Sequence, residues 1–226
     1  MDSFTWIQTR DGSPTLWYNN LAEPFRSLKG AFTETWHVFV KPALEQALRL
    51  ERPVSVGEFG LGVGTNWLLW SLAAKAMRIP HNYFVIERES GFFVMGLSRW
   101  KQNAPLISQF LERNGIKLSE KEIIEDIEGF KSPSIYGSLM EAQESSQKAD
   151  IWFHDPFGFT VNPEAYHTNT LELCRNLWAP GCMGYSYACN RHFQESLESL
   201  GQMEVSILPT GHPDLKRERL TFLKLI

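Results

Sequence analysis

One stretch of the sequence constrains the fold more than any other, the run VSVGEFGLGVGTN at residues 54–66. Its first half is short and apolar, which is typical of a buried strand. Three glycines then follow at every second position: Gly60, Gly62 and Gly64. They predict a turn, because glycine accepts positive φ and lets a ligand lie against the backbone. Thr65 or Asn66 can cap a helix whose first N–H groups are unpaired, so the stretch indicates a site for a nucleotide-like ligand.

The residues around the glycines bear on which ligand binds. The dinucleotide fingerprint is GxGxxG, which admits a pyrophosphate, whereas this turn is GxGxG with Glu58 two residues upstream. A carboxylate beside the ligand would repel a pyrophosphate. It suits the sulfonium and amino groups of S-adenosyl-L-methionine (SAM), which carries no phosphate. We therefore expect SAM rather than a nicotinamide dinucleotide at this turn.

Two later strand-like runs also end in carboxylates. Residues 83–88 place Glu87 about twenty residues past the turn, the spacing at which an acid can accept hydrogen bonds from a ribose diol. Residues 149–155 end at Asp155 and lead into a loop rich in turn-forming residues. Because the carboxyl ends of parallel strands share one edge of a sheet, the glycine turn and both acids should converge on one site.

Strand-like and helix-like segments alternate through most of the chain. This alternation predicts an α/β fold with a mostly parallel, doubly wound sheet. Two closing strands, near residues 205–208 and 220–226, predict an antiparallel hairpin at the C-terminal end. At 226 residues we expect a single domain, with residues 51–226 as its core and residues 1–50 as an N-terminal lid or accessory segment.

The N-terminal segment carries several polar residues among its aromatic ones, including Arg26, Ser27, Glu34 and His37. One interpretation is that the segment only packs on the sheet and leaves these side chains on its surface, where polar residues are common. The other is that it turns them toward the cofactor pocket. The pattern alone leaves both open.

Composition sets limits on partners and compartment. The formal net charge of −4 argues against broad, non-specific binding of nucleic acid, although it leaves room for a local basic face. No signal segment is evident, and no apolar run approaches the roughly eighteen residues of a membrane span, so we expect a cytoplasmic protein outside membranes. The three cysteines form no CxxC pair, so we expect reduced thiols and no bound metal.

Several segments spread along the chain match the pattern of one family. They are Asp11–Thr15 (DGSPT), Phe25–Phe39 (FRS, GAF, E and HVF), Glu58–Asn66 (EFGLGVGTN), Asp150–Tyr166 (DIWFHDPF, NP and Y), and Gly211 with KRE at 216–218. The chain resembles the MnmC-like SAM-dependent methyltransferases, the methyltransferase domain of the bifunctional tRNA 5-methylaminomethyl-2-thiouridine biosynthesis proteins. The resemblance covers nearly the whole chain, and the segment from Trp-Phe-x-Asp to Asn-Pro is its most specific part.

The resemblance implies a Rossmann-like methyltransferase fold and SAM as the cofactor. By position, Glu58 and the glycines would hold the methionine end of SAM, and Glu87 the ribose. The other positions matched to the cofactor side are Ser27, Glu34 and Asn66. Asp155 would border the substrate as the catalytic residue, orienting an amine and receiving its excess proton. The substrate-side positions are Phe157, Asn162, Pro163, Lys216, Arg217 and Tyr166, the last an aromatic ring able to stack a base.

The resemblance also implies an acceptor. In this family it is the primary amine of a 5-aminomethyl group on the wobble (2-thio)uridine of tRNA, which makes tRNA the expected partner. One alternative is a methyltransferase of the same fold acting on a small molecule or another RNA, and another is a SAM-binding protein without catalysis. The acid that the family places near the adenine falls on Ser138 here. The resemblance includes no oxidoreductase domain, so an oxidoreductase partner, if one exists, is expected on a separate chain.

Overall fold

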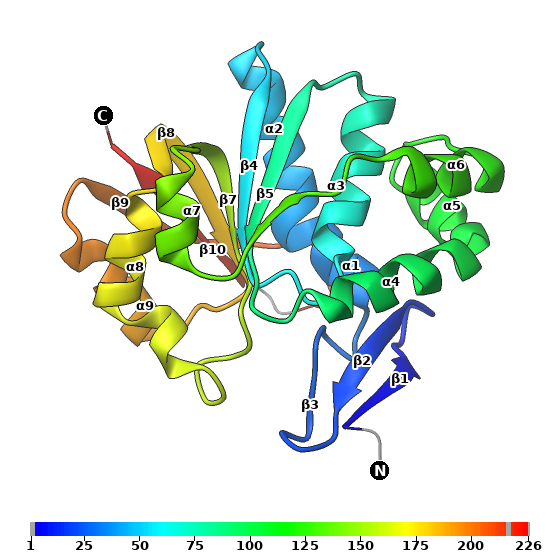
Figure 1. Cartoon of the computed structure of the whole chain (residues 1–226), viewed down its shortest axis with the longest axis horizontal. Helices are drawn as coiled ribbons and strands as arrows, with labels where there is room; N and C mark the ends of the chain where they lie inside the picture. Colours follow the sequence, from blue (N-terminus) through cyan, green and yellow to red (C-terminus); the bar gives the residue numbers. More distant parts are fainter. Residues whose placement is uncertain (1–2, 216–217, 226) are drawn as a thin grey trace.

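In the computed structural model, which describes residues 3–215 and 218–225, a seven-stranded sheet forms the centre of the fold (Figure 1). Its strand order is β6-β5-β4-β7-β8-β10-β9. The strands are β4 (Val54–Phe59), β5 (His81–Ile86), β6 (Ser134–Tyr136), β7 (Ala149–His154), β8 (Trp178–Ser186), β9 (Met203–Pro209) and β10 (Glu218–Lys224). The first five in the sheet order run parallel, and β10 is antiparallel to both β8 and β9. The expected fold class, with its closing antiparallel hairpin, is confirmed.

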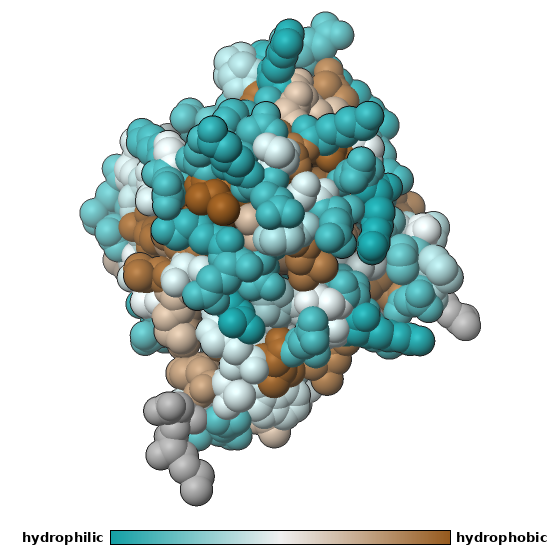
Figure 2. All heavy atoms as spheres, turned by 90° about the vertical axis from the view of Figure 1, so that its right-hand side faces the viewer, coloured by the Kyte–Doolittle hydropathy of each residue, from teal (hydrophilic) through white to brown (hydrophobic). Residues whose placement is uncertain are grey.

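Helices cover both faces of this sheet (Figure 1). One layer holds α2 (Lys41–Leu50), α3 (Thr65–Ala76), α4 (Gly91–Gln102), α5 (Ala104–Arg113) and α6 (Glu120–Gly129); the other holds α7 (Leu139–Glu144), α8 (Thr168–Arg175) and α9 (Arg191–Ser199). Because side chains alternate along a strand, Ile151 and Phe153 of β7 pack with the first layer and Trp152 with the second. Figure 2 shows the outward face on the α4–α6 side, where apolar residues form separate spots among hydrophilic ones. No helix in the described ranges combines the length and apolarity needed to cross a bilayer.

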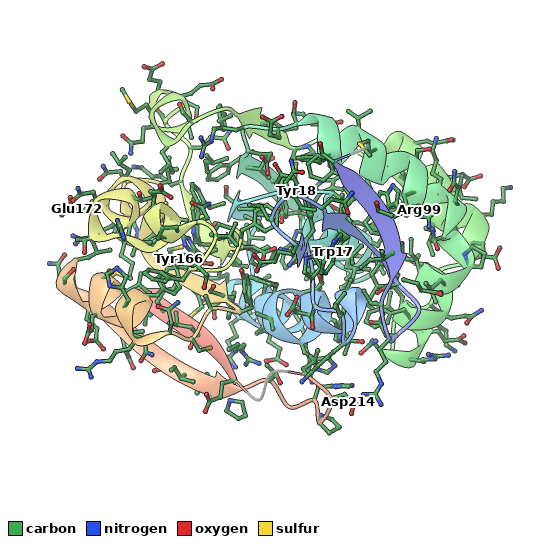
Figure 3. The ribbon with its side chains drawn as sticks, turned by 90° about the horizontal axis from the view of Figure 1, so that it is seen from below. Trp17, Tyr18, Arg99, Tyr166, Glu172 and Asp214 are labelled. Atoms are coloured by element: carbon green, nitrogen blue, oxygen red, sulfur yellow. The ribbon has the colours of Figure 1, made fainter. Side chains whose placement is uncertain are left out.

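The N-terminal segment forms a small antiparallel sheet that lies below the large one in Figure 1. It consists of β1 (Phe4–Gln8), β2 (Pro14–Tyr18) and β3 (Glu23–Pro24), and the chain continues through α1 (Ala31–Glu34) and a π-helical segment (Thr35–Val40) into α2. Figure 3, seen from below, shows β2 with Trp17 and Tyr18 in front of the large sheet. Asp11 holds the turn between β1 and β2 in place: its Oδ2 accepts hydrogen bonds from the Thr33 N–H (2.9 Å) and the Thr33 hydroxyl (2.6 Å).

Candidate active site

A cavity of about 850 Å³ lies at the carboxyl ends of β4, β5 and β7. This volume falls within the usual range for small-molecule sites. The glycine turn, the end of β5 with Glu87, the end of β7 with Asp155, and residues 137–139 before and at the start of α7 all line it. Six aromatic residues among the described ones complete the wall: Phe4, Tyr18, Phe25, Phe59, Phe92 and Phe157. The strand ends therefore meet at one site, as the sequence pattern predicted, and the N-terminal sheet closes it.

Two of the three glycines face this cavity. Gly60 has a φ of +92°, and a Cβ built there would lie 2.7 Å from the Asp155 carbonyl oxygen. Gly62 has a φ of +52°, and a Cβ there would lie 2.9 Å from the Phe25 ring. Gly64 instead precedes α3, does not line the cavity, and leaves room for Phe93, whose ring would lie 2.6 Å from a Cβ. The first two glycines keep the turn close to neighbouring residues, and the third serves packing.

Glu87 stands at the end of β5, on the cavity wall. Its Oε2 accepts a hydrogen bond from the Gly62 N–H at 3.0 Å, and its Oε1 accepts one from the Glu89 N–H at 2.9 Å. These bonds hold the carboxylate beside the glycine turn, and each oxygen keeps a lone pair for a further donor. The position is compatible with the predicted contact to a ribose diol, which stays a prediction.

Glu58 and Asn66 are placed differently from the prediction. Both are completely buried, and neither is among the described residues that line the cavity. Glu58 accepts hydrogen bonds from the Asn66 amide at 2.7 Å and from the Tyr83 hydroxyl at 2.9 Å. Burial and the nearby charge of Asp155 raise the pKa of Glu58 to about 8, against the opposing effect of Arg26. The alternation of β4 turns Glu58 toward the α3 layer, so Glu58 lies behind the wall of the cavity, and its contact with the cofactor stays a prediction.

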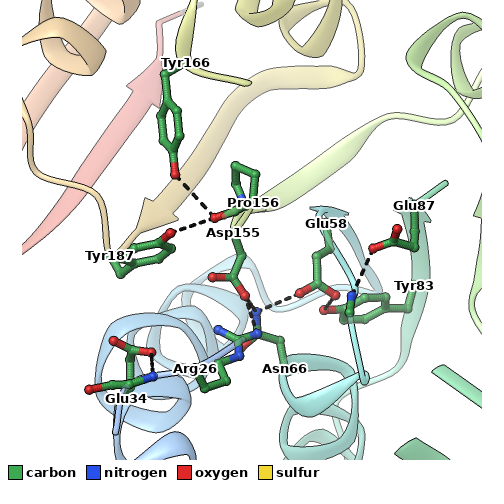
Figure 4. Close-up of polar contacts among 12 residues, drawn as sticks. Arg26, Glu34, Glu58, Asn66, Tyr83, Glu87, Asp155, Pro156, Tyr166 and Tyr187 are labelled. Atoms are coloured by element: carbon green, nitrogen blue, oxygen red, sulfur yellow. Dashed lines mark hydrogen bonds and ion pairs between the residues drawn. The ribbon is translucent and has the colours of Figure 1, made fainter. Parts of the chain in front are cut away.

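Asp155, unlike Glu58, lines the cavity. Its side chain is 4% exposed, forms an ion pair with Arg26, and accepts a hydrogen bond from the Asn66 amide at 2.8 Å (Figure 4). Burial raises the pKa of Asp155 to about 7, and Glu34 adds to the rise while Arg26 and Asn66 oppose it. Asn66 thus bridges Glu58 and Asp155. A buried carboxylate of raised pKa can accept a proton near neutral pH.

A smaller cavity of about 150 Å³ adjoins the first one. Four residues line both cavities: Phe25, Arg26, Asp155 and Phe157. Ser27 and Glu34, which were matched to the cofactor side, line only this smaller cavity, and the Ser27 N–H donates to Glu34 Oε2 at 3.0 Å. The N-terminal segment therefore does turn polar side chains inward, although the two matched residues lie on the far side of Asp155 from the glycine turn.

The loop after β7 contributes Phe157 and Asn162 to the larger cavity, while Pro163 begins a 3₁₀-helical turn (Pro163–Tyr166). The expectation that Tyr166 stacks on a base is wrong, because this residue is completely buried. Its hydroxyl donates to the Phe157 carbonyl at 3.0 Å and so fixes the loop from within. Lys216 and Arg217 lie outside the described residues.

Sequence reasoning did not identify two parts of the site. One is the aromatic wall, whose rings come from β1, β2, the residue after β3, β4, α4 and the β7 loop and meet only in three dimensions. The other is the pairing of Arg26 with Asp155, which nothing in either local pattern signals. Ser138 does line the cavity, and its hydroxyl accepts the Glu141 N–H at 3.2 Å, so it caps α7.

Comparisons with known proteins agree with this geometry. Residues 135–219 match the model of a family described as S-adenosyl-L-methionine-dependent methyltransferase. A curated relative, the tRNA 5-methylaminomethyl-2-thiouridine biosynthesis bifunctional protein MnmC of Campylobacter hominis, is 26% identical over 200 residues, which cover 82% of this chain. The chain spans only 28% of the length of that relative.

Two solved structures show the same fold. MnmC2 from Aquifex aeolicus is similar with a TM-score of 0.69 and 22% identity, over 100% of this chain and 71% of that one. Spermidine synthase from Thermotoga maritima is similar with a TM-score of 0.59 and 9% identity, over 98% of this chain and 68% of that one. Family model, curated relative and fold together support a SAM-dependent methyltransferase that is similar to the MnmC proteins.

Proposed function

We propose that the chain methylates the primary amine of a 5-aminomethyl group on the wobble uridine of tRNA. The observation that carries this proposal is the position of Asp155, a buried carboxylate on the wall shared by the two cavities. The larger cavity has room for the cofactor, and the smaller one lies directly across Asp155 from it. The curated relative, named for biosynthesis of a methylaminomethyl nucleoside in tRNA, supports this choice of acceptor.

The larger cavity fits SAM through its own residues. Gly60 and Gly62 line it, and their missing side chains let the turn lie against the Asp155 backbone and the Phe25 ring. Glu87 offers carboxylate oxygens to hydroxyl donors. Apolar side chains beside them, Ile86, Leu139 and Phe92, suit an adenine ring. When bound, SAM supplies an electrophilic methyl group on its sulfonium.

Asp155 then has two tasks in the transfer. The amine must present a neutral nitrogen in line with the methyl group, and a fixed carboxylate at the wall orients its N–H bonds. As the new C–N bond forms and the C–S bond breaks, the nitrogen becomes positively charged, and its excess proton can pass to Asp155. The raised pKa of Asp155 makes it a better proton acceptor than an ordinary aspartate.

The test is methyl transfer from labelled SAM to tRNA from cells that lack the modification, followed by nucleoside analysis. We expect label in a methylated 5-aminomethyluridine, and much less with Asp155→Asn at equal SAM binding. Loss of the signal at high salt would agree with phosphate contacts to tRNA. SAM binding without label in any tRNA nucleoside would contradict the proposal.

A second candidate is a small-molecule amine as acceptor. The net charge of −4 and the limited size of the smaller cavity favour it, because neither favours a large polyanion. The same labelled SAM, incubated with a low-molecular-weight cell extract, distinguishes the two. Label in the extract and none in tRNA would select this candidate.

A further inference from the structure

We infer that the smaller cavity is a two-point subsite for the acceptor, which binds a primary amine together with a neighbouring hydrogen-bond acceptor atom. This inference rests on the proposed function and adds to it which residues select the acceptor. It moves Ser27 and Glu34 from the cofactor side of the site to the acceptor side.

The first point of recognition is an excess of negative charge. Among the residues that the structure describes, three carboxylates line the cavity, Glu23, Glu34 and Asp155, against one cation, Arg26. Glu34 is only 6% exposed. Glu23 reaches across to the β7 loop, where its Oε1 lies 3.4 Å from the position a Cβ would take on Gly158. Buried charges need partners, and an ammonium or amine from a ligand supplies the missing one here.

The second point is an unpartnered donor. Arg26 is 5% exposed at its side chain, and its Nη2 pairs with Asp155, whereas its Nη1 is buried without a hydrogen-bond partner among the described residues. Figure 4 shows Arg26 between Asp155 and Glu34. A buried donor without a partner costs free energy until a ligand atom accepts its hydrogen bond. The atom that fits is a carbonyl oxygen adjacent to the amine, as on a uracil ring substituted with aminomethyl at the next carbon.

The shape of the cavity agrees with this ligand. The rings of Phe25 and Phe157 meet edge to face at 4.9 Å between centroids, and both residues line the two cavities. A volume of about 150 Å³ admits an aminomethyl group and part of a pyrimidine ring, whereas the rest of a nucleotide must lie outside. Asp155 stands where the two cavities meet, so an amine held by Glu34 and Glu23 lies next to the larger cavity.

The decisive experiment compares two nucleosides, 5-aminomethyluridine and 5-hydroxymethyluridine, which differ only in the charged group. Their affinities are measured by calorimetry with S-adenosyl-L-homocysteine present. We expect the wild type to prefer the amine by about tenfold to a hundredfold, the range of a charge-assisted hydrogen bond. Glu34→Gln keeps an oxygen for the Ser27 N–H but loses the charge, so it should remove most of this preference.

Glu23→Gln is the second variant, because its half-exposed side chain can change without disturbing the fold. Glu112→Gln, on the exposed surface of α5, is the matched control and should keep the preference. All variants should bind S-adenosyl-L-homocysteine like the wild type. Equal affinity of the wild type for both nucleosides would overturn the inference, as would an unchanged preference in both cavity variants. Methyl transfer to tRNA is measured separately, so failure of transfer with an intact amine preference would count against the proposed function alone.

Discussion

Gly60→Ala tests whether the first glycine of the turn is required by its conformation alone or also by close approach of the β7 loop. The φ of +92° makes any side chain unfavourable, at a cost of about 1–2 kcal/mol. In addition, the new Cβ would lie 2.7 Å from the carbonyl oxygen and 2.9 Å from the carbonyl carbon of Asp155. These are backbone atoms that cannot rotate away, so overpacking should add about 1–3 kcal/mol.

Gly115→Ala is the matched control. Gly115 also has a positive φ, +84°, it is exposed at the end of α5, and a Cβ there would meet nothing within 4 Å. The free energy of unfolding of Gly115→Ala should therefore fall only by the cost of a side chain at positive φ, about 1–2 kcal/mol. That of Gly60→Ala should fall by about 2–5 kcal/mol in total. Urea unfolding followed by tryptophan fluorescence gives both values.

SAM binding separates the two variants further. To relieve the overlap, Gly60→Ala must push the Asp155–Pro156 backbone away from the turn, which displaces the wall shared by both cavities. We expect its affinity for SAM, measured by calorimetry, to fall by about tenfold or more, while Gly115→Ala binds like the wild type. Equal losses of stability in the two variants, with unchanged SAM binding in both, would refute the close-approach argument.

Three further predictions concern the carboxylates. Asp155→Asn should lower kcat by about 10²–10⁴-fold at nearly constant SAM affinity. The rate of the wild type should rise with pH through about 7, because Asp155 loses its proton there. This rise should be missing from the pH–rate profile of the variant. Glu58 has a pKa of about 8 in the folded protein, above its ordinary value of 4.5. Between these two pH values the folded protein therefore binds more protons than the unfolded chain, so its free energy of unfolding should fall as pH rises. Urea unfolding at pH 5.5 and 9 should show a smaller fall in Glu58→Gln. Glu87→Ala should weaken SAM binding by about tenfold in calorimetry, and an unchanged affinity would reject the ribose contact.

The parts of the fold that sequence predicted are those encoded by local patterns. A short apolar run before three alternating glycines fixes β4, the turn and α3 within one continuous segment. The same holds for Glu87 and Asp155, because each directly follows a buried strand, and parallel strands bring their carboxyl ends to one edge. These features can be predicted from the local sequence without knowing which distant residues contact it.

The structure differs from the predictions where orientation or a distant contact decides the outcome. Glu58 was expected at the ligand because it is close to the glycines in sequence, but strand alternation turns it toward α3 and Tyr83. Tyr166 follows the loop after β7, yet tertiary packing buries its ring and uses its hydroxyl to hold that loop. Arg26 gave no local signal of its pairing, since its partner Asp155 lies at the end of another strand much later in the chain.

The buried pair of Arg26 and Asp155 has a thermodynamic consequence for the N-terminal segment. It joins the residues just after β3 to the end of β7, and both side chains are withdrawn from solvent. Breaking such a pair costs about 3–5 kcal/mol, so a ligand that competes for Asp155 acts directly on the docking of that segment. Linkage is reciprocal, and whatever loosens the segment must change the affinity for such a ligand by the same factor. One coupling free energy therefore links the docking of the first thirty residues to the affinity for the acceptor. It can be measured as the effect of the acceptor on docking or as the effect of docking on acceptor affinity.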